Sequence, residues 1–262
     1  MEVLSFILLG TCVGTFGTMI GLGGGLILVP LFMFTMLAPN GTTFDTVQQL
    51  VGTSLFAVAC NSISGTLAYL RQKRIMFRAA IPFALATIPG AFAGSLVSEY
   101  FTGAGFSIAF GMLLAVLGCF MYWKSNSKRA TANADDFDPA TAKFNLPLGV
   151  VLTFGVGFIS TIFGIGGGII DVPMMVFILG FPTQIAVASS TFILMTSSLI
   201  GTISHAMLDH IVWLPAVCIG IGCVLGAQIG ALISKKSKPK MLVVILSVTM
   251  VLMGIQLIYR GL

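Results

Sequence analysis

The sequence predicts an all-α, multi-pass membrane protein made of two related halves. Hydrophobic residues make up 57% of the 262-residue chain and charged residues only 8%, whereas a soluble domain carries about 25% charge. Apolar stretches of about 20 residues recur along the chain, which suits membrane-spanning helices rather than barrel strands. The phrase GLGGGLILVP at residues 21–30 returns as GIGGGIIDVP at residues 164–173. This recurrence predicts an internal repeat.

Each half is expected to contain one glycine-broken segment followed by three transmembrane helices. The two glycine phrases are 143 residues apart, and Val51–Phe56 matches Val187–Phe192 at an offset of 136 residues. We expect a first repeat over residues 1–123, a polar cytoplasmic linker over 124–146 and a second repeat over 147–262. The predicted segments of the first half are 3–37, 48–70, 76–98 and 103–123, and those of the second half are 147–180, 183–207, 212–233 and 240–259.

Three adjacent glycines in each phrase break a helix. A break inside a membrane frees backbone N–H and C=O groups, which is tolerated only where protein or a water-filled cavity satisfies them. A continuous helix of about 35 residues would be roughly 50 Å long, well beyond the roughly 30 Å hydrocarbon core. Each segment is therefore expected to fold back at its glycines, as a re-entrant hairpin or as two short helices. The second helix would run over about 26–37 or 169–180.

The basic residues predict how the helices cross the membrane. If each half crosses an odd number of times, the basic groups share one face, as the positive-inside tendency favours. The loops 71–78, 124–143 and 235–240 would then be cytoplasmic, and the repeats would be inverted, which is the arrangement that supports alternating access. Twelve of the thirteen basic residues form these groups: Arg71, Lys73, Arg74 and Arg78; Lys124, Lys128, Arg129 and Lys143; Lys235, Lys236, Lys238 and Lys240.

The helices that follow the glycines are expected to begin near the bilayer centre. A helix N-terminus offers free N–H donors and about half a positive charge, so two such ends meeting across inverted repeats would bind an anion without Lys or Arg. Close packing is the alternative role of these glycines and hydroxyls, and it is the expected role of the pairs Gly90/Gly94 and Gly226/Gly230. The candidate substrate-binding residues are Gly23, Gly24, Gly25, Gly166, Gly167, Gly168, Thr53, Ser54, Asn61, Ser189 and Ser190.

Asp171 is the acid inside the second glycine-broken segment, where the first half has Leu28. Because a carboxylate inside a membrane is energetically unfavourable, it is a functional candidate by default. We predict that Asp171 carries a proton for coupled transport. The alternatives are a carboxylate held by nearby backbone N–H groups and a shallower position in a loop.

Neither a metal nor a cofactor is expected. His205, Asp209 and His210 have a spacing that could hold a metal, but no third or fourth ligand is apparent, which favours a polar helix end. All five cysteines lie in apolar segments without a CxxC pair, and they are expected to pack as small hydrophobic residues. The net charge of +5 lies in short loops that orient the protein, so no nucleic-acid partner is expected.

The paired GxGGGxxxVP phrases, the duplicated four-segment halves and the chain length resemble the TauE/SafE family of sulfite and organosulfur anion exporters. The resemblance implies a transporter of sulfite, sulfoacetate or a related small anion in the plasma (inner) membrane of a prokaryote. It carries the glycines at 23–25 and 166–168 over from the family motif, whereas it does not assign Asp171.

A secondary transporter that exports a small oxyanion, with protons as the candidate driving ion, is therefore the leading expectation. Its partners would be the anionic substrate, the lipid bilayer and, as an open alternative, further copies of the chain. An anion channel on the same scaffold is the second hypothesis. The third is a sulfur-handling membrane protein that depends on Cys60 or Cys218. No enzymatic activity is expected, and the chain contains no GxxxxGK[ST] motif for ATP.

Overall fold

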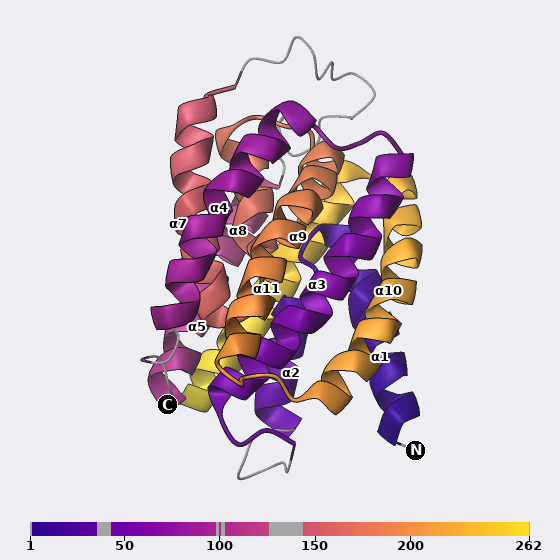
Figure 1. Ribbon diagram of the computed structural model, residues 1–262. Helices are drawn as coiled ribbons and strands as arrows, with labels where there is room; N and C mark the ends of the chain where they lie inside the picture. The colour runs from indigo at the N-terminus through magenta and orange to yellow at the C-terminus, as the bar shows by residue number, and fades with distance from the viewer. Residues whose placement is uncertain (1, 36–42, 98–99, 101–102, 126–143, 262) are drawn as a thin grey trace.

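A computed structural model describes residues 2–35, 43–97, 100, 103–125 and 144–261 as a bundle of helices (Figure 1). Within these ranges eight helices are long and apolar enough to cross a membrane, which confirms the all-α membrane class. The helices are α1 Glu2–Ile20, α2 Gly25–Thr35, α3 Val47–Arg71, α4 Phe77–Val97, α5 Gly103–Lys124, α7 Leu146–Phe163, α8 Gly168–Pro173, the π-helix η3 Met174–Ile178, α9 Thr183–Met207, α10 Trp213–Lys236 and α11 Pro239–Gly261.

Both glycine phrases break the helix, as predicted. α1 stops at Ile20 and α7 stops at Phe163, and α2 and α8 begin only after the glycines. Three glycines in each turn have backbone angles φ between +68° and +101°, a region that side chains other than glycine rarely occupy. The glycines with this geometry are Gly21, Gly23 and Gly24 in the first turn, and Gly164, Gly166 and Gly167 in the second.

The two broken segments enter the bundle from opposite ends. α1 runs from the end that holds the N-terminus to about half the height of the bundle, and α2 returns to that end; α7 and α8 do the same from the other end (Figure 1). The tips meet, because Gly25 packs against the backbone of Ile165, and Gly168 packs against the backbone of Gly21 and Leu22. Each segment is therefore a helical hairpin whose tip lies inside the bundle.

α3 and α9 form the centre of the bundle. In their most apolar stretches 78% and 67% of the residues are buried, against 39–56% in the other six long helices. Around this pair, α1 packs against α10, α4 against α7, and α5 against α11. Glycines permit the close approach: Gly90 and Gly94 lie against backbone of α7, and Gly226 and Gly230 lie against backbone of α1. The packing role predicted for these GxxxG pairs is confirmed.

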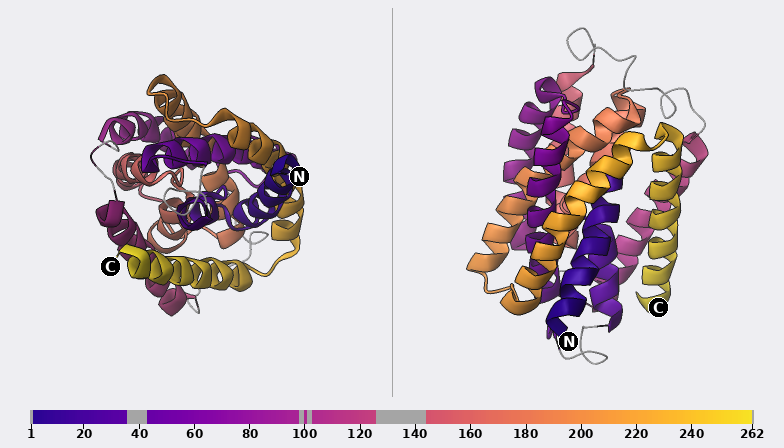
Figure 2. Two further views of the ribbon diagram at one scale, coloured as in Figure 1. Left: turned by 90° about the horizontal axis from the view of Figure 1, so that it is seen from below. Right: turned by 90° about the vertical axis from the view of Figure 1, so that its right-hand side faces the viewer.

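Apart from Arg260, near the C-terminus at the end of α11, the described basic residues lie at one end of the bundle. The connection between α3 and α4, the C-terminal end of α5 and the connection between α10 and α11 are all at the end opposite to both chain termini (Figures 1 and 2). Lys128, Arg129 and Lys143, and most of the predicted linker, lie outside the described residues. Residues of the three basic groups therefore share a face wherever the structure describes them.

Candidate functional site

Each glycine turn is held by a serine from the other half of the chain. Ser54 of α3 donates a hydrogen bond of 3.1 Å to the carbonyl oxygen of Gly164, and Ser190 of α9 donates one of 3.2 Å to the carbonyl oxygen of Gly21. Both serines are fully buried. The two serines are 136 residues apart and the two glycines are 143 apart, so these contacts join equivalent positions crosswise.

Two apolar side chains cover both turns. A Cβ atom on Gly23 or on Gly166 would run into the side chains of Val58 and Leu194. Val58 of α3 and Leu194 of α9 are each the twelfth residue of a 25-residue helix. The turns therefore meet half way along the two central helices, and in this structure the space beside them is closed by packed side chains.

In both turns, serine hydroxyls donate hydrogen bonds to glycine carbonyl oxygens. They do not accept from the backbone amides that start α2 and α8. Ser197 adds a third such bond, 2.6 Å long, to the carbonyl oxygen of Gly166. In contrast, the first amides of a helix have no carbonyl acceptor within their own helix. In α2 and α8 these amides belong to Gly25, Leu26, Gly168 and Ile169. They lie where the two tips meet and carry the positive ends of both helix dipoles.

The predicted hydroxyl pairs divide into two roles. Ser54 and Ser190 reach the turns, whereas their neighbours Thr53 and Ser189 accept 3.0 Å hydrogen bonds from the backbone N–H groups of Val212 and Met76. Thr53 and Ser189 thus hold the chain between helices. Asn61 donates a 2.9 Å hydrogen bond to Thr18. Its side-chain oxygen Oδ1 has no hydrogen-bond partner among the residues that the structure describes.

Asp171 lies in α8, three residues after its first residue, and is fully buried. Neither carboxyl oxygen hydrogen-bonds to any described residue. Ser160, in the last turn of α7, is also fully buried, and its hydroxyl is unpaired within the same part of the chain. The sequence analysis missed Ser160. At the 143-residue offset, Ser160 corresponds to Gly17 and Asp171 corresponds to Leu28. Only the second half therefore has polar residues at these two positions.

The histidine pair of α9 and the cysteines of α10 are not among the nearest neighbours of the glycines in the two turns. The Nδ1 atoms of His205 and His210 are 3.2 Å apart at the end of α9. The described residues contain no group of three or more His, Cys, Asp or Glu side chains close enough to hold a metal ion. Cys218 and Cys223 are buried in α10, as expected for small hydrophobic residues, whereas Cys60 is half-buried and Cys12 and Cys119 are exposed.

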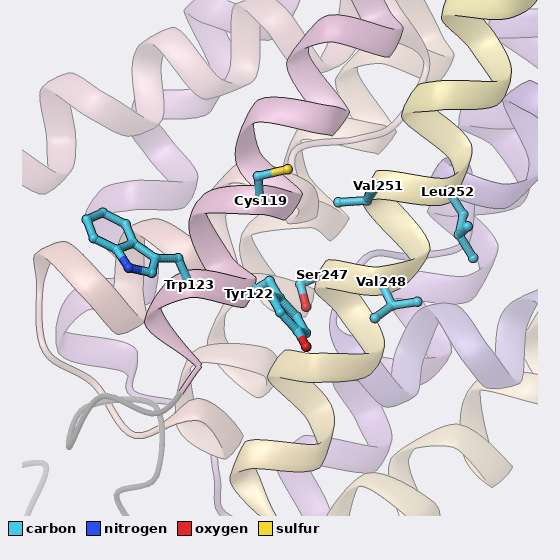
Figure 3. A pocket seen from close by; sticks show the side chains of 7 residues that line it. All are labelled: Cys119, Tyr122, Trp123, Ser247, Val248, Val251 and Leu252. Atoms are coloured by element: carbon cyan, nitrogen blue, oxygen red, sulfur yellow. The ribbon is translucent and has the colours of Figure 1, made fainter.

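A groove of about 630 Å³ runs between α5 and α11 on the outer surface of the bundle (Figure 3). Most of its lining is exposed and apolar, which suits contact with lipid chains. It is lined by Cys119, Tyr122, Trp123, Ser247, Val248, Val251 and Leu252, so no residue of the glycine turns takes part in it.

A sequence model of the sulfite exporter TauE/SafE family matches residues 6–257, nearly the whole chain. The chain belongs to the TauE/SafE family. The probable membrane transporter protein YunE of Bacillus subtilis is 34% identical over 270 residues, covering 100% of this chain and 99% of the relative. A probable membrane transporter protein of Xylella fastidiosa is 30% identical, covering 87% and 83%.

The family also has an archaeal member that resembles this chain. The probable membrane transporter protein MJ0441 of Methanocaldococcus jannaschii is 29% identical, covering 95% of this chain and 92% of the relative. No solved structure gives a significant match. The family and the names of the relatives indicate that this TauE/SafE protein is a multi-pass membrane transporter.

Proposed function

We propose that this protein is a secondary transporter that exports a small oxyanion, such as sulfite or an organosulfonate, from a prokaryotic cell. The observation that carries the proposal is the meeting of two glycine turns whose carbonyl groups are bound by serines. Because Ser54 and Ser190 occupy the carbonyl side, the helix-start amides of α2 and α8 remain as the donors in the middle of the bundle. Sulfonate and sulfite oxygens accept several hydrogen bonds, so they fit such a cluster of amides.

Opposite insertion of the two hairpins supports an alternating-access mechanism. The tips enter from opposite ends of the bundle (Figure 1), as expected for inverted repeats with a site near the midplane. Val58 and Leu194 close the space beside both turns. Separation of α3 from one hairpin or of α9 from the other would open the same site to one side at a time. In this proposal the basic end is cytoplasmic.

Asp171 supplies the coupling in this proposal. A buried carboxylate without a partner is costly, whereas its protonated form is neutral. A proton taken up from outside at Asp171, next to the second turn, would be carried inward after the anion has left, and this exchange would link anion export to the inward proton gradient. The expected outcome for Asp171→Asn is transport that no longer depends on pH.

The test is transport by the purified protein in proteoliposomes. We expect accumulation of sulfite, thiosulfate or sulfoacetate against its gradient when a pH gradient is imposed, and weaker transport of simple carboxylates. Sulfate and an empty-liposome control complete the panel. Flux that equilibrates an anion and never concentrates it would instead indicate a channel, and flux of none of these anions would refute the proposed substrate class.

A further inference from the structure

Two fully buried side chains beside the second glycine turn have unused hydrogen-bonding atoms. The hydroxyl of Ser160 and both carboxyl oxygens of Asp171 have no hydrogen-bond partner among the described residues. Ser160 differs in this from the other hydroxyl residues near it in α7. Thr153 and Thr161 donate to carbonyl oxygens four residues earlier in the helix, at Gly149 and Gly157, which is the usual solution for a hydroxyl inside a helix.

The two side chains converge from different helices. A Cβ atom on Gly167 would lie 3.1 Å from Oδ2 of Asp171 and 3.3 Å from Oγ of Ser160. Both oxygens therefore face the same side of the turn, Ser160 from the end of α7 and Asp171 from the start of α8. A hydroxyl oxygen and a carboxyl oxygen that converge in this way can share one proton between them.

A proton is the cation that fits these surroundings. α5, α7 and α9 pack against α8, and their titratable groups are Cys119, Tyr122 and Lys124 in α5 and His205 in α9. Cys119 and Tyr122 line the outer groove (Figure 3), Lys124 lies over the ring of Trp123, and His205 pairs with His210. Within the described part of the chain, none of these groups supplies Asp171 with a counter-charge.

The equivalent positions of the first half carry no such pair. Gly17 corresponds to Ser160 and Leu28 to Asp171. Gly17 has no room for a side chain, because a Cβ atom there would collide with the backbone of Gly24. The glycine turn therefore occurs in both halves, whereas the serine–aspartate pair beside it occurs only in the second half.

We propose that Ser160 and Asp171 together bind one proton per transport cycle, and that this single site lies in the second half only. The carboxylate of Asp171 takes the proton from one side of the membrane, and the new O–H group donates a hydrogen bond to the hydroxyl oxygen of Ser160. Reversal on the other side releases the proton and restores the carboxylate. Ser160 is a positioning residue. The inference rests on the proposed function, because it names the coupling partner of that site.

The experiment compares Ser160→Ala and Ser160→Thr with Ser247→Ala, a control that removes another buried serine hydroxyl, in α11. An organosulfonate keeps its charge across the pH range, so its transport in proteoliposomes reports the protein's own protonation. Loss of one hydrogen bond predicts that Ser160→Ala moves the midpoint of the pH profile by about one unit. Ser160→Thr and Ser247→Ala should keep the wild-type midpoint.

Exchange of labelled for unlabelled organosulfonate distinguishes failure of the Ser160–Asp171 inference from failure of the proposed transport function. Exchange that persists in Ser160→Ala with an unchanged midpoint would overturn the inference and leave the proposed function intact. No exchange by the wild-type protein would instead defeat the proposed function. If Ser160→Ala does not fold, Ser160→Cys decides the matter, because its thiol is a weak hydrogen-bond acceptor and must also move the midpoint. A measured ratio of two protons per anion would contradict the single site.

Discussion

The hydroxyl oxygens of Ser62 in α3 and Ser198 in α9 lie 3.2 Å apart, so one hydroxyl donates a hydrogen bond to the other. These residues are 136 positions apart, the offset at which the two halves match. Equivalent residues therefore face each other in the middle of the molecule. The bonds from Ser54 to Gly164 and from Ser190 to Gly21 also join the two halves, and they too involve equivalent residues. Together they mark the surface between the halves.

The Ser62–Ser198 contact predicts a measurable coupling between α3 and α9. Ser62→Ala and Ser198→Ala each remove the shared hydrogen bond, and the double variant has nothing further to lose there. We expect a coupling energy of about 0.5–1 kcal/mol in a double-mutant cycle, the range found for hydrogen bonds between membrane helices. Thermal unfolding in detergent measures it. Strictly additive effects would show that the two hydroxyls do not interact.

The crossed bonds predict that Ser54→Ala and Ser190→Ala have matching effects. Each variant frees the carbonyl oxygen of one glycine turn, so each should lower stability by about 1 kcal/mol and weaken anion binding to a similar degree. Thr153→Val is the control, since its hydroxyl bonds only within its own helix. Substrate-dependent thermal shifts measure both quantities. A strong effect of one serine with none of the other would contradict the crosswise arrangement.

The contact between the two tips predicts a steric effect at Gly25. A Cβ atom there would lie 2.7 Å from the Cα atom of Ile165 and would wedge the turns apart. Gly25→Ala should abolish transport and destabilise the protein by about 1–3 kcal/mol, as overpacking does. Gly155→Ala is the matched control, because its Cβ would meet no atom within 4 Å and alanine favours a helix. Wild-type transport by Gly25→Ala would show that the tips do not meet.

The position of the broken segments could be predicted from sequence because its cause is local. Three consecutive glycines disfavour a helix wherever they stand, and the observed breaks before Gly25 and Gly168 follow. The positions of the basic residues predicted which connections between helices lie at the same end of the bundle. Both inferences needed only patterns along the chain.

The partners of individual hydroxyls could not be predicted in the same way. Thr53 and Ser54 are adjacent, yet side chains one residue apart in a helix point about 100° away from each other, so only Ser54 reaches a turn. Ser160 was missed because its role depends on where α8 folds back beside α7. The π-helical turn after Pro173 could not be predicted either. The corresponding Pro30 lies within a regular α-helix, so a proline at this position does not by itself indicate a π-helical turn.

The shared end of the basic residues predicts the sidedness of the protein. In a variant whose five cysteines are replaced by alanine, a new cysteine at Gln72 or Ser237 should react with an impermeant thiol reagent only from the cytoplasm. A cysteine at Asp209 should react only from outside. Labelling of intact cells and of inverted vesicles measures this. Gln72 and Ser237 on opposite sides would contradict the topology.

The cysteine-free background also tests the sulfur-handling alternative. Because all five cysteines are free thiols in the structure and none belongs to the turns, we expect anion transport within about twofold of wild type, a change of about 0.4 kcal/mol. The measurement is initial uptake rate per folded protein. Loss of transport that returns only when Cys60 or Cys218 is restored would favour the alternative.

The central claim is that the anion binds between the two glycine turns. It is tested most directly by a structure determined with selenite, a heavier relative of sulfite that anomalous scattering identifies. We predict one selenium peak whose oxygens lie about 2.7–3.2 Å from the amide nitrogens at the starts of α2 and α8. A peak found only beside the basic residues at the α3–α4 and α10–α11 connections, with the turns still packed together, would contradict it.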